Sequence, residues 1–275
     1  MKIIERLSLL LLLTTGICFA VFWYQKWQNA DSVRPEIVCD TPEIEVGVNV
    51  TEEQLLEGVT AWDNRDGDLT DKILIASYSK FVDKGVRNIK LVVFDSHYNV
   101  AQMTRTVRYT DYVSPRFYLK KPLQFRANST INLYDCIGAT DCLDGDISDK
   151  IKVVYNDAGT SNSNPGEYEV GFQVSNSAGD VSYLTANVEI YEGSYYKPEI
   201  LLSRYLLYVK QGAEFKPERY IEKTESALET EELTAADVQI YSTVNTSVPG
   251  NYEVRYSIVS ENGYEGTSRL IVIVE

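Results

Sequence analysis

The sequence predicts an all-β protein in which an N-terminal transmembrane helix precedes three tandem antiparallel β-sandwiches. Three features lead to this prediction. An uncharged apolar run lies near the N-terminus, short alternating segments punctuated by Gly, Pro, Asn and Asp fill the remainder, and an acidic motif recurs. A repeat at a fixed period indicates that one structural unit has been duplicated. A chain of 275 residues is long enough for two or three small domains.

The apolar run covers residues 7–24, and its length just reaches what a helix needs to cross a bilayer. Lys2 and Arg6 precede it, and aromatic residues of the kind found at membrane interfaces follow at Trp23 and Trp27. This pattern predicts an anchor with its N-terminus in the cytoplasm and the rest of the chain outside.

We therefore expect residues 1–28 to stay attached as a membrane anchor. The alternative is a cleaved signal peptide, because residues 18–20 loosely match the small-x-small pattern of a cleavage site. The mature protein would then be secreted. In both cases the β-domains lie outside the cell.

Each predicted domain opens with a proline and an extended apolar run, at Pro35, Pro115 and Pro198. Proline is tolerated at the first residue of a strand because its missing N–H lies outside the ladder. Each domain closes with two alternating strands joined by a short turn. The linkers are short, so we expect neighbouring domains to stack end to end. The predicted domains are 35–112, 113–192 and 197–275.

The repeated motif A-x-D-x-x-D-G-D begins at Ala61 and again at Ala139. Clustered carboxylates can converge on calcium, which takes six to eight oxygen ligands. The alternative is turn chemistry, in which Asp side chains accept hydrogen bonds from nearby N–H groups and Gly permits a positive φ. An Asp-based hydrolase is a third, less expected possibility, since an active site usually occurs once. The candidate ligands are Asp63, Asp66, Asp68, Asp71, Asp141, Asp144, Asp146 and Asp149.

Three motifs together carry a family resemblance. They are the Asp-Gly-Asp frames at 66–68 and 144–146, the pattern Gly-x-x-Phe-x-Pro-x-x-Tyr-Ile at 212–221, and Pro-Gly-x-Tyr at 165 and 249. Residues 35–275 thereby resemble the bacterial immunoglobulin-like domains first noted in pesticidal crystal proteins and common on Gram-positive surface proteins. The resemblance implies three seven-stranded Ig-like sandwiches and a surface role, and it implies no catalysis. The third repeat departs from the pattern, because residues 229–234 lack the glycine.

Two other groups of residues are candidate sites. Cys136 and Cys142 are close enough in sequence to form a disulfide in an oxidising compartment, or they are two half-buried thiols. Tyrosines outside the alternating strands are candidates for a ligand-contact surface, because an aromatic ring offers an apolar face and a polar tip. These are Tyr195, Tyr196, Tyr205 and Tyr208.

The single histidine, His97, falls in a predicted hairpin turn and lacks the motif of a catalytic triad around it. The net charge of −14 argues against a nucleic-acid partner, because acidic domains repel the phosphate backbone. No cofactor is expected apart from calcium at the aspartate motif.

The sequence therefore predicts a non-enzymatic, membrane-anchored extracellular protein that serves as a stalk, adhesion or interaction module. Its expected partners are the membrane, through the N-terminal helix, and a cell-envelope polymer or surface protein. The alternative is a glycan or cell-wall binding module centred on the third domain.

Overall fold

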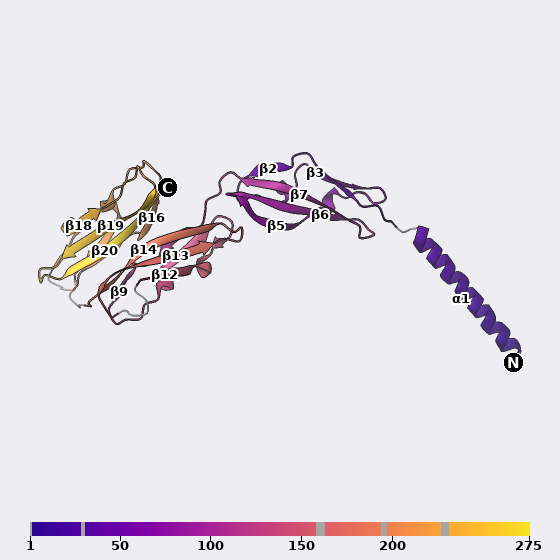
Figure 1. Ribbon diagram of the computed structural model, residues 1–275, viewed down its shortest axis with the longest axis horizontal. Coiled ribbons are helices and arrows are strands. Elements are labelled where there is room, and N and C mark those ends of the chain that lie inside the picture. Colours follow the sequence, from indigo (N-terminus) through magenta and orange to yellow (C-terminus); the bar gives the residue numbers. More distant parts are fainter. Residues whose placement is uncertain (1, 29–30, 158–162, 194–196, 227–230) are drawn as a thin grey trace. The chain divides into compact units, whose positions relative to one another are not determined.

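The computed structural model describes residues 2–28, 31–157, 163–193, 197–226 and 231–275 (Figure 1). One helix is followed by strands arranged in six sheets, which confirms the predicted all-β class with an N-terminal helix. The chain forms two compact units, residues 1–111 and 112–275. The second unit holds both of the domains predicted at 113–192 and 197–275, and that subdivision remains a prediction.

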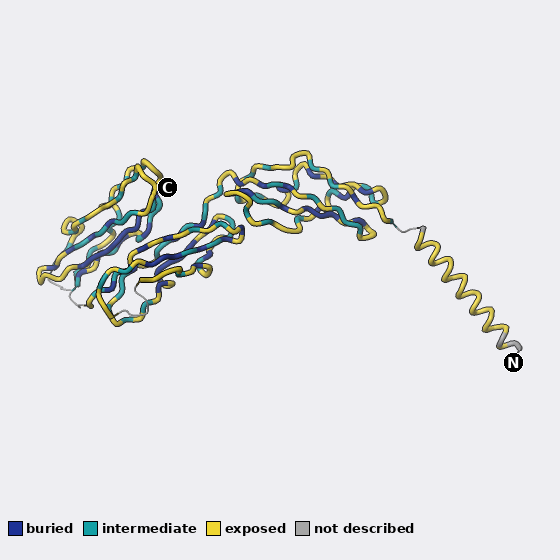
Figure 2. The backbone as a smooth tube through the Cα atoms, in the orientation of Figure 1, coloured by how far each residue is buried: buried dark blue, intermediate teal, exposed yellow. Residues whose placement is uncertain are grey.

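The N-terminal helix α1 spans Lys2–Gln28. Its stretch Arg6–Trp27 has a mean hydropathy of 2.0, and none of it is buried against the protein (Figure 2). Two hydroxyls in this stretch, those of Thr14 and Thr15, donate to the carbonyl of Leu11 at 2.9 Å. These bonds satisfy polar groups inside the helix, as a hydrocarbon environment requires.

The first unit consists of α1 and two facing sheets. The larger sheet has the strand order β2-β7-β6-β5, and the smaller has the order β1-β3-β4. A short helix α2 (Glu52–Leu55) is preceded by Thr51, which forms a capping box with Gln54. The strands are β1 (Glu36–Cys39), β2 (Glu43–Val46), β3 (Val59–Asp63), β4 (Gly67–Asp68), β5 (Leu74–Asp83), β6 (Val86–Phe94) and β7 (Val100–Tyr109).

The alternation of apolar and polar residues decides which face of each strand is buried. In β6, Ile89, Leu91 and Val93 are 0% exposed, whereas Lys90 points to solvent. This is the period-two pattern of a half-buried strand. The core of the first unit is therefore the layer between its two sheets.

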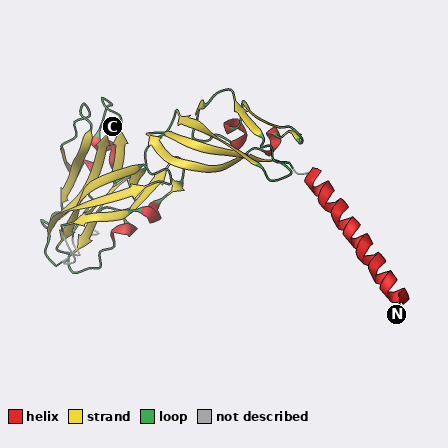
Figure 3. Cartoon of the chain, turned by 45° about the vertical axis from the view of Figure 1, so that its right-hand side comes forward, coloured by secondary structure: helices red, strands yellow, loops and turns green. Residues whose placement is uncertain are grey.

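The second unit has four sheets, with the orders β11-β10-β8, β12-β13-β14-β9, β15-β17 and β16-β20-β19-β18 (Figure 3). Short 3₁₀ turns η1 to η5 connect strands in both units. They cover Thr70–Lys72, Leu133–Asp135, Ser148–Lys150, Pro217–Tyr220 and Ala235–Asp237. The strands are β8 (Arg116–Leu119), β9 (Gln124–Arg126), β10 (Ile137–Asp141), β11 (Gly145–Asp146), β12 (Lys152–Asn156), β13 (Gly166–Ser175), β14 (Val181–Tyr191), β15 (Glu199–Leu202), β16 (Leu206–Val209), β17 (Ile221–Glu225), β18 (Gln239–Ser242), β19 (Gly250–Val259) and β20 (Glu265–Val274).

The three four-stranded sheets share one topology. In each sheet an early strand pairs in parallel with the last strand of the repeat: β2 with β7, β9 with β14, and β16 with β20. The last strand then pairs antiparallel with the strand before it. The acidic motif indicated a duplicated unit, and the strand pairing is duplicated as well. The third repeat has the same pairing.

The end-to-end arrangement expected from the short linkers is not what the second unit shows. The outer faces of its two four-stranded sheets lie against each other, so that Leu206 and Ile271 join the core cluster of the preceding repeat. On β20, Thr267, Arg269 and Ile271 are at most 9% exposed. The physical reason is that this outer face carries side chains with matching partners on β13 and β14, described below.

Candidate functional site

The two acidic loops fold in the same way. Asp63 Oδ1 accepts hydrogen bonds from the N–H groups of Arg65 (2.8 Å) and Asp66 (3.0 Å). Asp141 Oδ1 accepts the same pair from Leu143 (2.9 Å) and Asp144 (3.0 Å). Each first aspartate therefore closes its loop by bonding the next residues of the chain, which is the turn chemistry of Asp.

The second aspartate of each loop reaches the hairpin turn between the last two strands of its repeat, β6 and β7 or β13 and β14. Asp66 accepts from the N–H (2.5 Å) and hydroxyl (2.9 Å) of Ser96, and these bonds lower the pKa of Asp66. Asp144 accepts from the N–H (2.7 Å) and hydroxyl (2.6 Å) of Ser177. Burial opposes ionisation of Asp144, but these bonds and Lys150 outweigh it and lower its pKa. The pair of bonds joins two loops at one end of each sandwich.

The third aspartate of each loop starts the following 3₁₀ turn. Asp68 Oδ1 and Asp146 Oδ1 each accept, at 2.9 Å, from the N–H of the residue two positions later. The glycine between the second and third aspartates has φ near +73° in both loops, at Gly67 and Gly145, a conformation that favours glycine. The last aspartates, Asp71 and Asp149, are exposed.

The third repeat keeps the connection although it has lost the glycine. Glu231 Oε1 accepts from the N–H of Glu261 at 2.6 Å, and Glu261 lies in the turn equivalent to that of Ser96. The longer glutamate side chain thus makes the bond that aspartate makes in the other repeats. The sequence analysis did not predict that Glu231 binds this turn. The carboxylate of Glu231, in the loop that corresponds to the acidic motif, could have indicated it.

One group of carboxylates in the first unit was not predicted as a set. Asp31, Asp63 and Asp95 each offer an oxygen, and the three oxygens lie within 4.8 Å of one another. Asp63 and Asp95 are 1% and 6% exposed, and the side chain of Asp31 is 4% exposed. Of the eight predicted ligands, only Asp63 belongs to this cluster. Within the described residues, the four aspartates of one loop do not converge on a common point.

Hydrogen bonds to Asp95 come from its own turn. Asp95 Oδ1 accepts from the N–H groups of His97 (2.8 Å) and Asn99 (2.7 Å), and Asp95 Oδ2 accepts from Asn99 Nδ2 (2.7 Å). Burial opposes ionisation, but these bonds outweigh it and lower the pKa of Asp95. Asn99 Nδ2 also donates to the carbonyl of Asp31 at 3.1 Å, so the turn holds the segment that precedes β1.

His97 is an exposed turn residue, as predicted. Its Nδ1 lies 3.1 Å from Ser96 Oγ, and that hydroxyl donates to Asp66. The serine therefore lies between the histidine and the aspartate. In a catalytic triad the histidine lies between the serine and the aspartate instead.

The structure places Cys136 and Cys142, the two cysteines considered for a disulfide, in different surroundings. Cys136 is buried, which raises the pKa of its thiol, and Cys142 is exposed with its Sγ 3.2 Å from the carbonyl of Val113. The two thiols make separate contacts, because Cys136 precedes β10 and Cys142 follows it.

The predicted tyrosines have different surroundings. Tyr208 is held inside the second unit, because its hydroxyl accepts from the N–H of Phe117 at 3.0 Å and Arg116 lies over its ring at 4.8 Å. Tyr205 packs on the core of the third repeat and, with Tyr191, lines a cavity of about 570 Å³. Tyr195 and Tyr196 lie outside the described residues.

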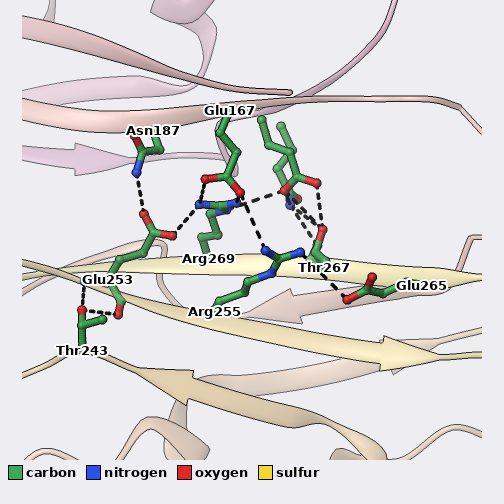
Figure 4. A network of polar contacts seen from close by, with 10 residues as sticks. Glu167, Asn187, Thr243, Glu253, Arg255, Glu265, Thr267 and Arg269 are labelled. Carbon is green, nitrogen blue, oxygen red and sulfur yellow. Dashed lines mark hydrogen bonds and ion pairs between the residues drawn. The ribbon is translucent and has the colours of Figure 1, made fainter. Parts of the chain in front are cut away.

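The most heavily charged contact of the second unit is centred on Arg269 (Figure 4). Arg269 Nη1 lies 2.5 Å from Glu253 Oε1, Nε lies 3.6 Å from Glu189 Oε2, and Nη2 pairs with Glu167. Arg269 and Glu253 come from the third repeat, whereas Glu167 and Glu189 come from the second. The four side chains therefore bind the outer faces of the two sheets together.

The electrostatics of this cluster favour the ionised forms. The bond from Arg269 lowers the pKa of Glu167. Desolvation opposes the charge on Arg269, but the three carboxylates outweigh it and raise the pKa of the guanidinium. Next to the cluster, Gln124 Nε2 donates to Glu189 Oε2 (2.8 Å) and to the carbonyl of Thr267 (3.0 Å). Sequence patterns did not identify this interface.

Comparison with solved structures returns β-proteins built from tandem domains. The CBM51-2 and INT domains of Clostridium perfringens ZmpB match at 18% identity over 55% of this chain and 26% of theirs, with a TM-score of 0.24. Drosophila N-cadherin EC1-3 matches at 11% identity over 90% of each chain, with a TM-score of 0.33. This chain spans about a third or less of the length of the two ZmpB structures. Similarities at this level do not bear on function.

No curated protein matches the sequence. A family model does match, over residues 205–274, and its description is "Bacterial surface protein, Ig-like domain". The matched range begins just before β16 and ends with β20, so it contains the four-stranded sheet of the third repeat. Over these residues the last repeat therefore matches the Ig-like domain of bacterial surface proteins.

Proposed function

We propose that the protein is a membrane-anchored, non-enzymatic surface protein whose Ig-like repeats act outside the cell as an adhesion or interaction arm. The observation that carries the proposal is the pairing of helix α1, apolar and unburied over Arg6–Trp27, with a surface-type Ig-like domain on the same chain. A helix with no apolar partner in its own protein is stable where lipid covers it.

The loops described above support a structural use of the aspartates. Asp66 and Asp144 accept hydrogen bonds from the turn residues Ser96 and Ser177, and the Ser96 hydroxyl, which lies beside His97, donates to Asp66. We therefore propose that the loops hold the ends of the sandwiches and that recognition occurs on sheet faces or loops elsewhere.

The test is membrane extraction of the native protein followed by N-terminal sequencing. An anchored protein stays in the membrane after alkaline washing and keeps the residues of α1. Recovery in the medium with an N-terminus after Ala20 would contradict anchoring and would favour the secreted alternative.

A second function, glycan binding by the third repeat, is favoured by the cavity at Tyr205. Tyr191 and Tyr205 line it together with polar groups of Gln124, Lys197 and Glu199. Aromatic rings with a few polar groups are typical of sites that hold small polar ligands.

The glycan function is tested by sedimentation with purified cell wall. Tyr205→Ala should reduce binding of the intact protein to the wall. Tyr241→Ala is the matched control, because Tyr241 is 70% exposed and does not line the cavity. Equal wall binding by the two variants would contradict a site at Tyr205.

A further inference from the structure

The cluster of Asp31, Asp63 and Asp95 brings together three separate parts of the first unit. Asp31 precedes β1, Asp63 ends β3, and Asp95 follows β6. Their oxygens lie within 4.8 Å of one another, and all three side chains are buried. Three carboxylates in so small a volume repel one another unless a cation lies among them.

Two oxygens in the cluster have no hydrogen-bond donor. Asp31 Oδ2 and Asp63 Oδ2 are both inaccessible to solvent and accept no hydrogen bond. A buried carboxylate oxygen that lacks a donor is costly, so native structures normally pair it with a donor or a metal ion. The two oxygens without a donor are a second observation, independent of the clustering, that points to a bound cation.

The positive charge beside the cluster is too small to neutralise it. Within the part of the chain that the structure describes, Arg65 forms an ion pair with the cluster, with its Nε 3.8 Å from Asp31 Oδ2. The side chain of Arg65 is 41% exposed, so water screens its charge. One screened guanidinium against three carboxylates leaves a net negative site.

In the second repeat, the residues that match Asp63 and Asp95 are joined by a hydrogen bond. There the residue matching Asp63 is Asp141, and the residue matching Asp95 is Asn176. Asn176 Nδ2 donates to Asp141 Oδ2 at 3.1 Å and to the hydroxyl of Tyr112 at 2.9 Å. The Asn176 amide therefore donates to Asp141 Oδ2 at the position where the first repeat has the carboxylate of Asp95.

We propose that Asp31, Asp63 and Asp95 bind one calcium ion. All the side-chain ligands are carboxylate oxygens, which suit a hard cation, and calcium accepts further carbonyl and water oxygens without a strict geometry. The ion joins the segment that precedes β1 to the end of the sandwich. This inference goes beyond the proposed function, because it does not depend on what the arm recognises.

The proposal differs from the calcium sites expected from sequence in residues and in number. The motif predicts two equivalent sites of four aspartates each, whereas the cluster gives one site that shares only Asp63 with them. The stoichiometry of binding therefore distinguishes the two.

The test is calorimetric titration of the full-length, detergent-solubilised protein, freed of metal, with calcium chloride and in parallel with magnesium chloride. We expect one calcium ion per chain, with a dissociation constant of about 10⁻⁴ to 10⁻³ M as in extracellular calcium modules. Two ions per chain, or no binding up to about 10 mM, would overturn the proposal. Equal affinity for magnesium would overturn the assignment to calcium.

Asp95→Asn gives the sharpest variant, because it copies the residue of the second repeat. The substitution removes one carboxylate ligand. In about 10 mM calcium the midpoint of thermal unfolding of the first unit should therefore rise above its value in chelator for the wild type and stay unchanged for Asp95→Asn. The wild-type rise should be about 5 °C or more.

Asp31→Asn is a second variant in a segment outside the strands, and it should weaken calcium binding at least about tenfold. Asp141→Asn is the matched control, because Asp141 closes its loop as Asp63 does and lies outside the cluster. It should leave stoichiometry and affinity unchanged. Calcium binding that survives both Asp95→Asn and Asp31→Asn, or that is lost in Asp141→Asn, would contradict the site.

Discussion

Replacing Arg269 by methionine tests the interface between the two outer sheet faces of the second unit. The side chain of Arg269 is 9% exposed, and those of its partners Glu189 and Glu253 are 14% and 27% exposed. Methionine fills much of the same volume but removes the cation. Glu189 and Glu253 are then left buried without their counter-charge, and this loss dominates the expected effect.

The magnitude follows from these exposures. Breaking a fully buried ion pair costs about 3–5 kcal/mol. Glu167 is half exposed and keeps part of its hydration. We therefore expect Arg269→Met to lower the free energy of unfolding of the second unit by about 2–4 kcal/mol. In a unit of this size that lowers the unfolding midpoint by roughly 5–15 °C.

Arg255→Met is the matched control for this experiment. Arg255 lies directly opposite Arg269 in the register of β19 and β20. Its side chain is 42% exposed, and its ion pairs with Glu167 and Glu265 are longer, at 3.7 and 3.9 Å. Its loss should cost less than about 1 kcal/mol. Calorimetry of the two full-length variants in detergent decides the point, and equal small shifts would refute the buried interface.

Two further predictions concern pH and backbone strain. Because Arg269 lowers the pKa of Glu167, the contribution of Glu167 to stability is fully present above its unfolded pKa and is lost as the pH falls through the folded value. The wild-type midpoint should therefore fall more steeply below about pH 5 than that of Arg269→Met, and parallel curves from calorimetry would contradict the coupling. Gly145→Ala should cost about 1 kcal/mol in denaturant titration, since Gly145 has φ +74° and an added Cβ meets nothing within 4 Å. An unchanged free energy of unfolding would show that the turn is not strained.

The strands were predictable because their signal is local. Ile89, Leu91 and Val93 recur at every second position of β6, and this period fixes which face is buried. The closure of the acidic loops was predictable for the same reason, because Asp63 and Asp141 bond residues two and three positions away.

The remaining features depend on contacts between distant residues. Asp31 precedes β1 and Asp95 follows β6, and only the closed sandwich brings them to Asp63. Similarly, Glu167 and Arg269 each look like solvent-facing residues of alternating strands, and their pairing exists only once two sheet faces meet. Glu231 keeps the loop connection of the third repeat through a longer side chain, which a search for Asp-Gly-Asp does not detect.

The most direct test of the central claim, an anchored protein with its repeats outside the cell, uses the native cysteine Cys142. This thiol is exposed on the second unit, whereas Cys136 is buried. A membrane-impermeant maleimide applied to intact cells should label the membrane-bound protein, and Cys142→Ser should remove most of the label. Labelling that appears only after the cells are lysed would place the repeats inside and contradict the account.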